Sequence, residues 1–148
     1  SGTGSWDDAQ FSGATNGGVT ALENSTNGEV VVVPVVRLAD NKPIHLLLQS
    51  LPLGPKRANV GIYYKELDQE EYDYLTPYEL APEWDGVKQI STLNSAYSTM
   101  MWQRDNNLGV LFEEETYCTS EYAYGGYTIA YESFSLEEIT DGKYAPRK

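Results

Sequence analysis

Short apolar and β-branched runs, separated by turn-forming residues, recur along most of the chain. Each run has the length of a strand, and Gly, Pro, Asn and Asp gather between them. No helical pattern exceeds one or two turns. Short strands at this spacing predict an antiparallel all-β fold, which could be a sandwich, a barrel or the blades of a propeller. The seven runs begin at Val19, Val30, Ile44, Val60, Tyr97, Leu108 and Tyr127.

The grouping of the runs favours blades. Four runs follow one another in the first half of the chain and three in the second half. A propeller blade has four antiparallel strands, so the second group lacks one strand. An open sheet edge is an aggregation hazard that proteins normally cover. We therefore expect a separate N-terminal chain or segment to complete residues 1–148.

Local signals refine this pattern. Residues 29–36 are β-branched nearly throughout, which predicts a strand buried on both faces or nearly so, with Pro34 at an edge, a bulge or a strand end. The group Asp105-Asn106-Asn107 predicts a hairpin between its flanking strands. Ser135 followed by Glu138 fits a capping box and predicts one short helical turn. Residues 68–85 are polar and aromatic and predict a surface excursion.

Composition narrows the possible partners. The formal net charge is −12, which repels nucleic acid and anionic membranes. No apolar run is long enough to span a bilayer, so we expect no membrane insertion, and no signal-peptide pattern opens the chain. We interpret the single cysteine, Cys118, and the single histidine, His45, as structural. No metal or cofactor is expected.

The hairpin brings two chemically interesting residues to one end of a sheet. Tyr97 precedes the first strand and Glu113 ends the second, so the two should lie close together. A tyrosine beside a carboxylate at the end of a sheet is an arrangement that suits catalysis. A buried tyrosine also needs a hydrogen-bond partner for its hydroxyl, so a structural role stays open.

Arg57 follows the rigid loop Pro52-Leu53-Gly54-Pro55-Lys56 and precedes a strand. A guanidinium held in this way can bind a carboxylate through two hydrogen bonds. Alternatively, Arg57 pairs with one of the abundant acidic residues. Together with Tyr97, it suits an enzyme that acts on an acidic sugar, because a neutral tyrosine is not repelled by a carboxylate at the reacting carbon.

Three motifs resemble the C-terminal part of bacterial exo-α-sialidases (neuraminidases). They are Leu-Gly-Pro-Lys-Arg at 53–57, Ser-Ala-Tyr-Ser-Thr-Met at 95–100 and Leu-Gly-Val-Leu-Phe-Glu at 108–113, and the resemblance covers about residues 5–140. It implies a six-bladed β-propeller, of which residues 1–148 form about the last two blades. It also implies a retaining glycoside hydrolase that removes terminal sialic acid from glycoconjugates, and an extracellular or cell-surface location in bacteria.

The resemblance also implies residue roles. Arg57 matches the third arginine of the triad that binds the sialic acid carboxylate. Tyr97 matches the nucleophile of the tyrosyl-enzyme intermediate, and Glu113 matches the acid that orients the first triad arginine. The first two triad arginines, the aspartate acid/base and the glutamate that activates the tyrosine lie earlier in the family's chain. Arg37 and Arg104 are wrongly placed to replace the missing arginines.

Three interpretations follow. The chain is the C-terminal part of a sialidase, active only when an N-terminal portion completes it. Alternatively, it is a catalytically silent propeller fragment or a sialic-acid-binding module that keeps Arg57 for carboxylate capture. In the third interpretation, the chain is a structural all-β domain. The interval from Arg57 to Tyr97 is longer than usual for the family, and residues 68–85 are where an insertion would lie.

Overall fold

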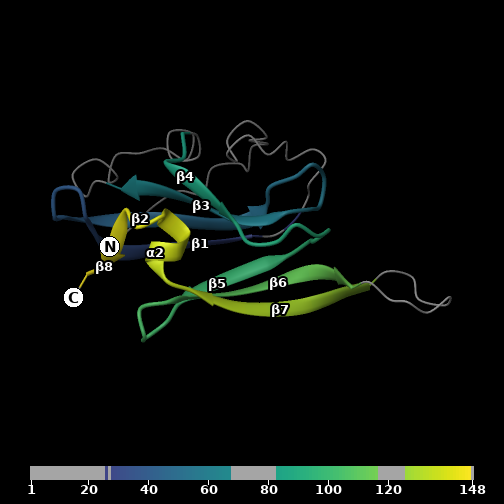
Figure 1. Cartoon of the computed structure of the whole chain (residues 1–148). Helices are drawn as coiled ribbons and strands as arrows, with labels where there is room; N and C mark the ends of the chain where they lie inside the picture. The colour runs from purple at the N-terminus through teal and green to yellow at the C-terminus, as the bar shows by residue number, and fades with distance from the viewer. Residues whose placement is uncertain (1–25, 27, 68–82, 117–125, 148) are drawn as a thin grey trace, which may run out of the picture.

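The computed structural model describes residue 26 and residues 28–67, 83–116 and 126–147 (Figure 1). This part of the chain is mostly β with almost no helix, as predicted. The strand expected near Val19 and most of the excursion at 68–85 lie outside it. The elements are β1 (Glu29–Arg37), β2 (Lys42–Pro52), β3 (Val60–Leu67), β4 (Gly86–Gln89), β5 (Ser98–Trp102), β6 (Leu108–Thr116), β7 (Gly126–Phe134), helix α2 (Leu136–Thr140) and β8 (Tyr144–Pro146).

The strands form two antiparallel sheets. One has five strands in the order β4-β3-β2-β1-β8, and the other has three in the order β5-β6-β7. Figure 1 shows the sheets as two layers, and together they curl into a half-barrel. The described residues thus form sheets of five and three strands instead of the expected four-stranded blades. The five-stranded sheet differs from the expected group because two strands that were not predicted join it: β4 pairs with β3 and the C-terminal strand β8 pairs with β1, at Val35–Arg37.

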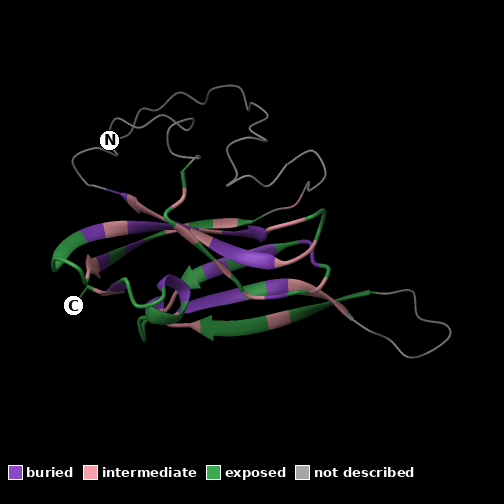
Figure 2. Cartoon of the chain, turned by 45° about the horizontal axis from the view of Figure 1, so that its top comes forward, coloured by how far each residue is buried: buried purple, intermediate pink, exposed green. Residues whose placement is uncertain are grey.

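The core lies between the inner faces of the two sheets (Figure 2). Alternate residues of each strand point inward, since successive strand side chains face opposite ways. Val33 and Val35 of β1 are fully buried, whereas Val30 and Val32 are exposed. The expectation that this strand is buried on both faces is therefore wrong. The core residues are Val33, Val35, Ile44, Leu46, Leu48, Val60, Ile62, Tyr64, Met100, Leu108, Val110, Phe112, Leu136, Ile139 and Tyr144.

Proline at position 34 is tolerated because β8 pairs with β1 only from Val35 onward. The other side of β1 pairs with β2 along its whole length, with Pro34 opposite His45. Proline has no N–H to donate to a ladder, so it suits a position at a sheet edge. Of the three alternatives, an edge, a bulge or a strand end, the structure places Pro34 where the pairing with β8 ends, in a strand that otherwise lies between β2 and β8.

Two local predictions are also confirmed. β5 and β6 form a hairpin in which Trp102 pairs with Leu108, and Asn106 in the turn has a φ of 64°. Helix α2 is capped by Ser135, whose hydroxyl accepts from the backbone N–H of Glu138 while the Glu138 side chain accepts from the Ser135 N–H. These reciprocal bonds satisfy two of the N–H groups that a helix start leaves unpaired.

A polar cluster links β8 to β1 and β3 within the five-stranded sheet. Arg37 donates to Glu66 through Nε at 2.8 Å and Nη2 at 2.5 Å, and to Asp40 through Nη1 at 2.9 Å. Tyr144 donates its hydroxyl to Glu66 Oε1 at 2.6 Å. Burial raises the pKa of Glu66, but the bonds from Arg37 and Tyr144 outweigh it and lower that pKa below its usual value. Burial and the bond to Glu66 raise the pKa of the Tyr144 hydroxyl.

We expect Glu66→Gln to lower the free energy of unfolding at neutral pH by about 1 kcal/mol, allowing for solvent screening. The folded-state pKa of Glu66 lies below the ordinary value of 4.5, so its stabilisation is present above that pH and is lost as the pH falls through the folded-state pKa. Urea unfolding across acidic pH should show a shallower loss of stability in the variant. The exposed Glu132→Gln is the control, and equal effects of the two substitutions would contradict the prediction.

Candidate functional site

The loop that carries Arg57 is held rigid by backbone hydrogen bonds across it. The Leu53 N–H donates to the Asn59 carbonyl at 2.8 Å, and the Gly54 N–H donates to the Ala58 carbonyl at 3.0 Å. The Asn59 side chain adds a bond from Nδ2 to the Gly54 carbonyl at 2.6 Å. Gly54 has a φ of 87° and precedes a cis peptide bond to Pro55. The fixed, irregular loop predicted from its prolines and glycine is confirmed.

This loop is joined to the segment that leads to Tyr97. The Ser95 N–H donates to the Arg57 carbonyl at 2.8 Å, and the Asn59 N–H donates to the Leu93 carbonyl at 2.9 Å. Ala58 and Asn94 form an isolated antiparallel bridge between these bonds. Two segments about 40 residues apart in sequence therefore run side by side at the site.

Tyr97 and Glu113 are paired, as the hairpin predicted. The Glu113 N–H donates to the Tyr97 carbonyl at 3.0 Å, and the Tyr97 N–H donates to Glu113 Oε2 at 3.3 Å. The first bond continues the β5–β6 ladder by one residue beyond Ser98. The second fixes the Glu113 side chain against the start of β5.

A pocket of about 250 Å³ opens beside this pair. Its lining consists of Tyr97, Ser98, Thr99, Leu111, Phe112, Glu113 and Ile129. The Tyr97 side chain is 46% exposed, so it does not serve as a buried core tyrosine. Arg57 is also exposed but is not among the described residues that line the pocket. The structure thus places Tyr97 and Glu113 in one pocket, and it bonds the Arg57 loop to the segment that leads to Tyr97 without placing Arg57 in the lining.

Two further contacts at the site were not predicted from the sequence. The Asn94 side chain donates to Glu115 Oε2 at 2.6 Å, and the Glu115 N–H donates to the Asn94 carbonyl at 2.8 Å. Ser98 donates its hydroxyl to Ser50 at 2.9 Å, and both serines are buried between the two sheets. The sequence features that could have indicated these contacts are the serine directly after Tyr97 and the acidic run Glu113-Glu114-Glu115. These contacts hold the Tyr97 segment on both sides.

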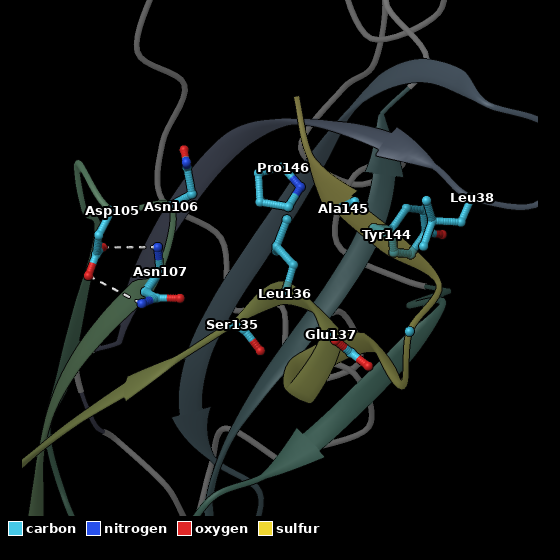
Figure 3. A pocket seen from close by; sticks show the side chains of 11 residues that line it. Leu38, Asp105, Asn106, Asn107, Ser135, Leu136, Glu137, Tyr144, Ala145 and Pro146 are labelled. Atoms are coloured by element: carbon cyan, nitrogen blue, oxygen red, sulfur yellow. Dashed lines mark hydrogen bonds between the residues drawn. The ribbon is translucent and has the colours of Figure 1, made fainter. Parts of the chain in front are cut away.

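A larger hollow of about 490 Å³ lies elsewhere, between the β5–β6 turn and the C-terminal segment (Figure 3). Asp105 points toward Asn107, and its carboxylate accepts two bonds from that residue, each 3.2 Å long. Tyr97, Glu113 and Arg57 are absent from the described lining of this hollow. We therefore place the candidate chemistry at the Tyr97 pocket and not in the larger hollow.

Other site types find no support in the described ranges. No group of three or more His, Cys, Asp or Glu side chains there could hold a metal ion. No described helix is long and apolar enough to cross a membrane. Cys118 lies outside the described residues. No protein-family model matches the chain, and no curated protein is significantly similar to it.

Proposed function

We propose that this chain is part of a retaining exo-α-sialidase, which cleaves terminal sialic acid from glycoconjugates. The observation that carries the proposal is the grouping of three separate segments. The Tyr97 segment is bonded to the Arg57 loop on one side and to Glu113 on the other. Tyr97 is 46% exposed and shares its pocket with Glu113. The rigid loop that bears the Arg57 guanidinium is bonded through its backbone to the segment that leads to Tyr97.

The proposed chemistry needs a tyrosine because the substrate is an anion. Sialic acid carries a carboxylate on the reacting carbon, which would repel a carboxylate nucleophile. Arg57 binds that carboxylate with the planar geometry of its guanidinium. The Tyr97 oxygen attacks the anomeric carbon as the glycosidic bond breaks, and water then releases the sugar from the tyrosine with overall retention.

Further groups must come from another polypeptide or segment. The departing alcohol needs a proton, and the Tyr97 hydroxyl must lose one as it attacks. We assign these roles to an aspartate and a glutamate of an N-terminal portion, together with two more arginines for the substrate carboxylate. In this proposal the two described sheets belong to the last blades of a six-bladed propeller that the N-terminal portion completes.

Hydrolysis of an aryl α-sialoside tests the proposal. The protein that includes the N-terminal portion should release the aryl group and give the α-anomer of sialic acid as its first product. An aryl β-galactoside, which has no carboxylate, should not be cleaved. Binding of sialic acid without turnover would instead support a sialic-acid-binding module. If the protein shows no binding and no turnover, the result would support a structural domain.

A further inference from the structure

The outer edge of the three-stranded sheet is open. Strand β7 is the last strand of this sheet, and no described strand pairs with it on the side away from β6 (Figure 1). Thr128 and Glu132, which share the inner face with Ala130, are exposed, and Ile129 and Tyr131 are exposed on the outer face. A nine-residue edge strand that is accessible on both faces is a template for pairing with another strand.

The hydrogen bonds of the sheet show which backbone groups face the open edge. The Glu113 N–H donates to the Tyr97 carbonyl, so the odd-numbered residues of β6 bond to β5 and the even-numbered ones face β7. Because Phe112 pairs with Ala130, the even-numbered residues of β7 bond back to β6. The N–H and C=O groups of the odd-numbered residues of β7 therefore face the open edge. These residues are Tyr127, Ile129, Tyr131 and Ser133.

This edge is complementary to itself. When two copies of β7 run antiparallel about Ala130, Ile129 lies opposite Tyr131 of the second copy, and Tyr127 lies opposite Ser133 of the second copy. Every N–H and C=O group that faces the open edge then has a partner. A shift of two residues in either direction leaves Tyr127 or Ser133 without a partner in the strand. The register about Ala130 also sets an aromatic residue against a β-branched one, which is a favourable cross-strand pair.

The charges along the edge permit a second copy. Glu132 is the only charged residue of β7, and in this register it lies opposite Thr128 and not opposite Glu132 of the second copy. The formal charge of −12 on each chain opposes association. Exposed charges farther apart than a Debye length, about 8 Å at physiological ionic strength, are largely screened. Added salt should therefore strengthen the pairing.

We propose that β7 is a homodimer interface, through which two copies of the chain join their three-stranded sheets into one continuous antiparallel sheet. Each copy supplies β7 as the neighbouring strand of the other, paired about Ala130. In strand addition of this kind, main-chain hydrogen bonds provide affinity and alternate side chains provide specificity. The inference does not rest on the proposed function, because its test reads the association of the 148-residue chain and not turnover.

Disulfide cross-linking at position 130 tests the register. Cys118 is the only cysteine, so Cys118→Ser combined with Ala130→Cys leaves one thiol in each chain. The two residues at the centre form a non-hydrogen-bonded pair, with Cα atoms about 4.5 Å apart, which lies within the range of about 4.4–6.8 Å that a disulfide spans. Under mild oxidation, this variant should form a disulfide-linked dimer.

Thr128→Cys in the same Cys118→Ser background is the matched control. Thr128 lies on the same face as Ala130, but in this register the two copies of residue 128 are separated by about 13 Å along the strands. Its cross-linking should be slower by about ten-fold or more, because that separation exceeds the reach of a disulfide. Equal cross-linking at the two positions, or none at position 130, would overturn the proposed pairing.

Two substitutions of Ile129 test whether backbone pairing holds the dimer. Ile129→Pro removes an N–H that faces the open edge and not β6, so the pairing of β7 with β6 should survive. In sedimentation velocity, the unmodified chain should dimerise increasingly with protein and salt concentration, whereas Ile129→Pro should stay monomeric. Ile129→Val keeps the N–H and the branched side chain and should dimerise like the unmodified chain. An unmodified chain that stays monomeric at all concentrations, or equal dimerisation of Ile129→Pro and Ile129→Val, would overturn the inference.

Discussion

Tyr97→Phe should lower sialidase turnover by roughly 10³-fold or more in the completed enzyme, the scale expected when a covalent nucleophile is lost. The substitution removes one oxygen from a side chain that is 46% exposed, so the core between the sheets is untouched. The melting temperature should therefore change little. Steady-state kinetics on an aryl sialoside, together with thermal unfolding, measure both quantities.

Tyr127→Phe is the matched control for this prediction. Tyr127 lies on β7 of the same sheet and is 49% exposed, so its substitution removes an equally accessible hydroxyl. The turnover of the Tyr127→Phe variant should remain close to that of the unmodified protein. Near-normal turnover in Tyr97→Phe would contradict the nucleophile assignment. A loss of stability without a specific loss of turnover would instead support a structural role for Tyr97.

Arg57→Lys should weaken the binding of sialic acid and of its planar dehydro analogue by about ten-fold or more. The substitution keeps the positive charge but removes the planar fork that binds a carboxylate through two bonds. A hydrogen bond to a charged group contributes roughly 1.5–3 kcal/mol, which corresponds to that loss. Because the loop is held by backbone bonds on both sides of Arg57, its conformation should survive. Inhibition constants measured by competition report the change.

Arg104→Lys is the control for Arg57. Arg104 is exposed between β5 and β6, at the opposite end of the hairpin from Tyr97 and Glu113. Its substitution should leave the inhibition constants unchanged. If Arg57→Lys also leaves them unchanged, Arg57 is a surface arginine that pairs with acidic residues, which is the alternative that the sequence left open.

The sequence was sufficient to predict those features that depend on residues adjacent to one another along the chain. The turn at Asp105-Asn106-Asn107 is encoded locally, and it sets the register that brings Tyr97 to Glu113. The Ser135 capping box is local in the same way. The rigidity of the Arg57 loop follows from its prolines and Gly54. These features could be predicted because each depends on short-range backbone preferences.

Long-range pairing could not be predicted in this way. β8 has three residues and no alternating pattern, yet it pairs with β1 about 110 residues earlier and gives the sheet five strands. The bridge between Ala58 and Asn94, which joins the Arg57 loop to the Tyr97 segment, also has no local signal. Periodicity likewise could not show that Val30 and Val32 remain exposed, since a run that is valine on both faces of the strand fits burial of one face or of both.

Covalent trapping tests the central claim, that Tyr97 is the nucleophile of a sialidase, most directly. A fluorinated sialyl fluoride should inactivate the completed enzyme: the Tyr97 oxygen bonds to the anomeric carbon as the anomeric fluoride leaves, which gives a long-lived aryl glycoside on the tyrosine oxygen. Mass spectrometry after trypsin digestion should find the label in the peptide 89–104, on Tyr97, with none in the Tyr97→Phe variant. A label on any other residue, or no label in an enzyme that turns over sialosides, would contradict the claim.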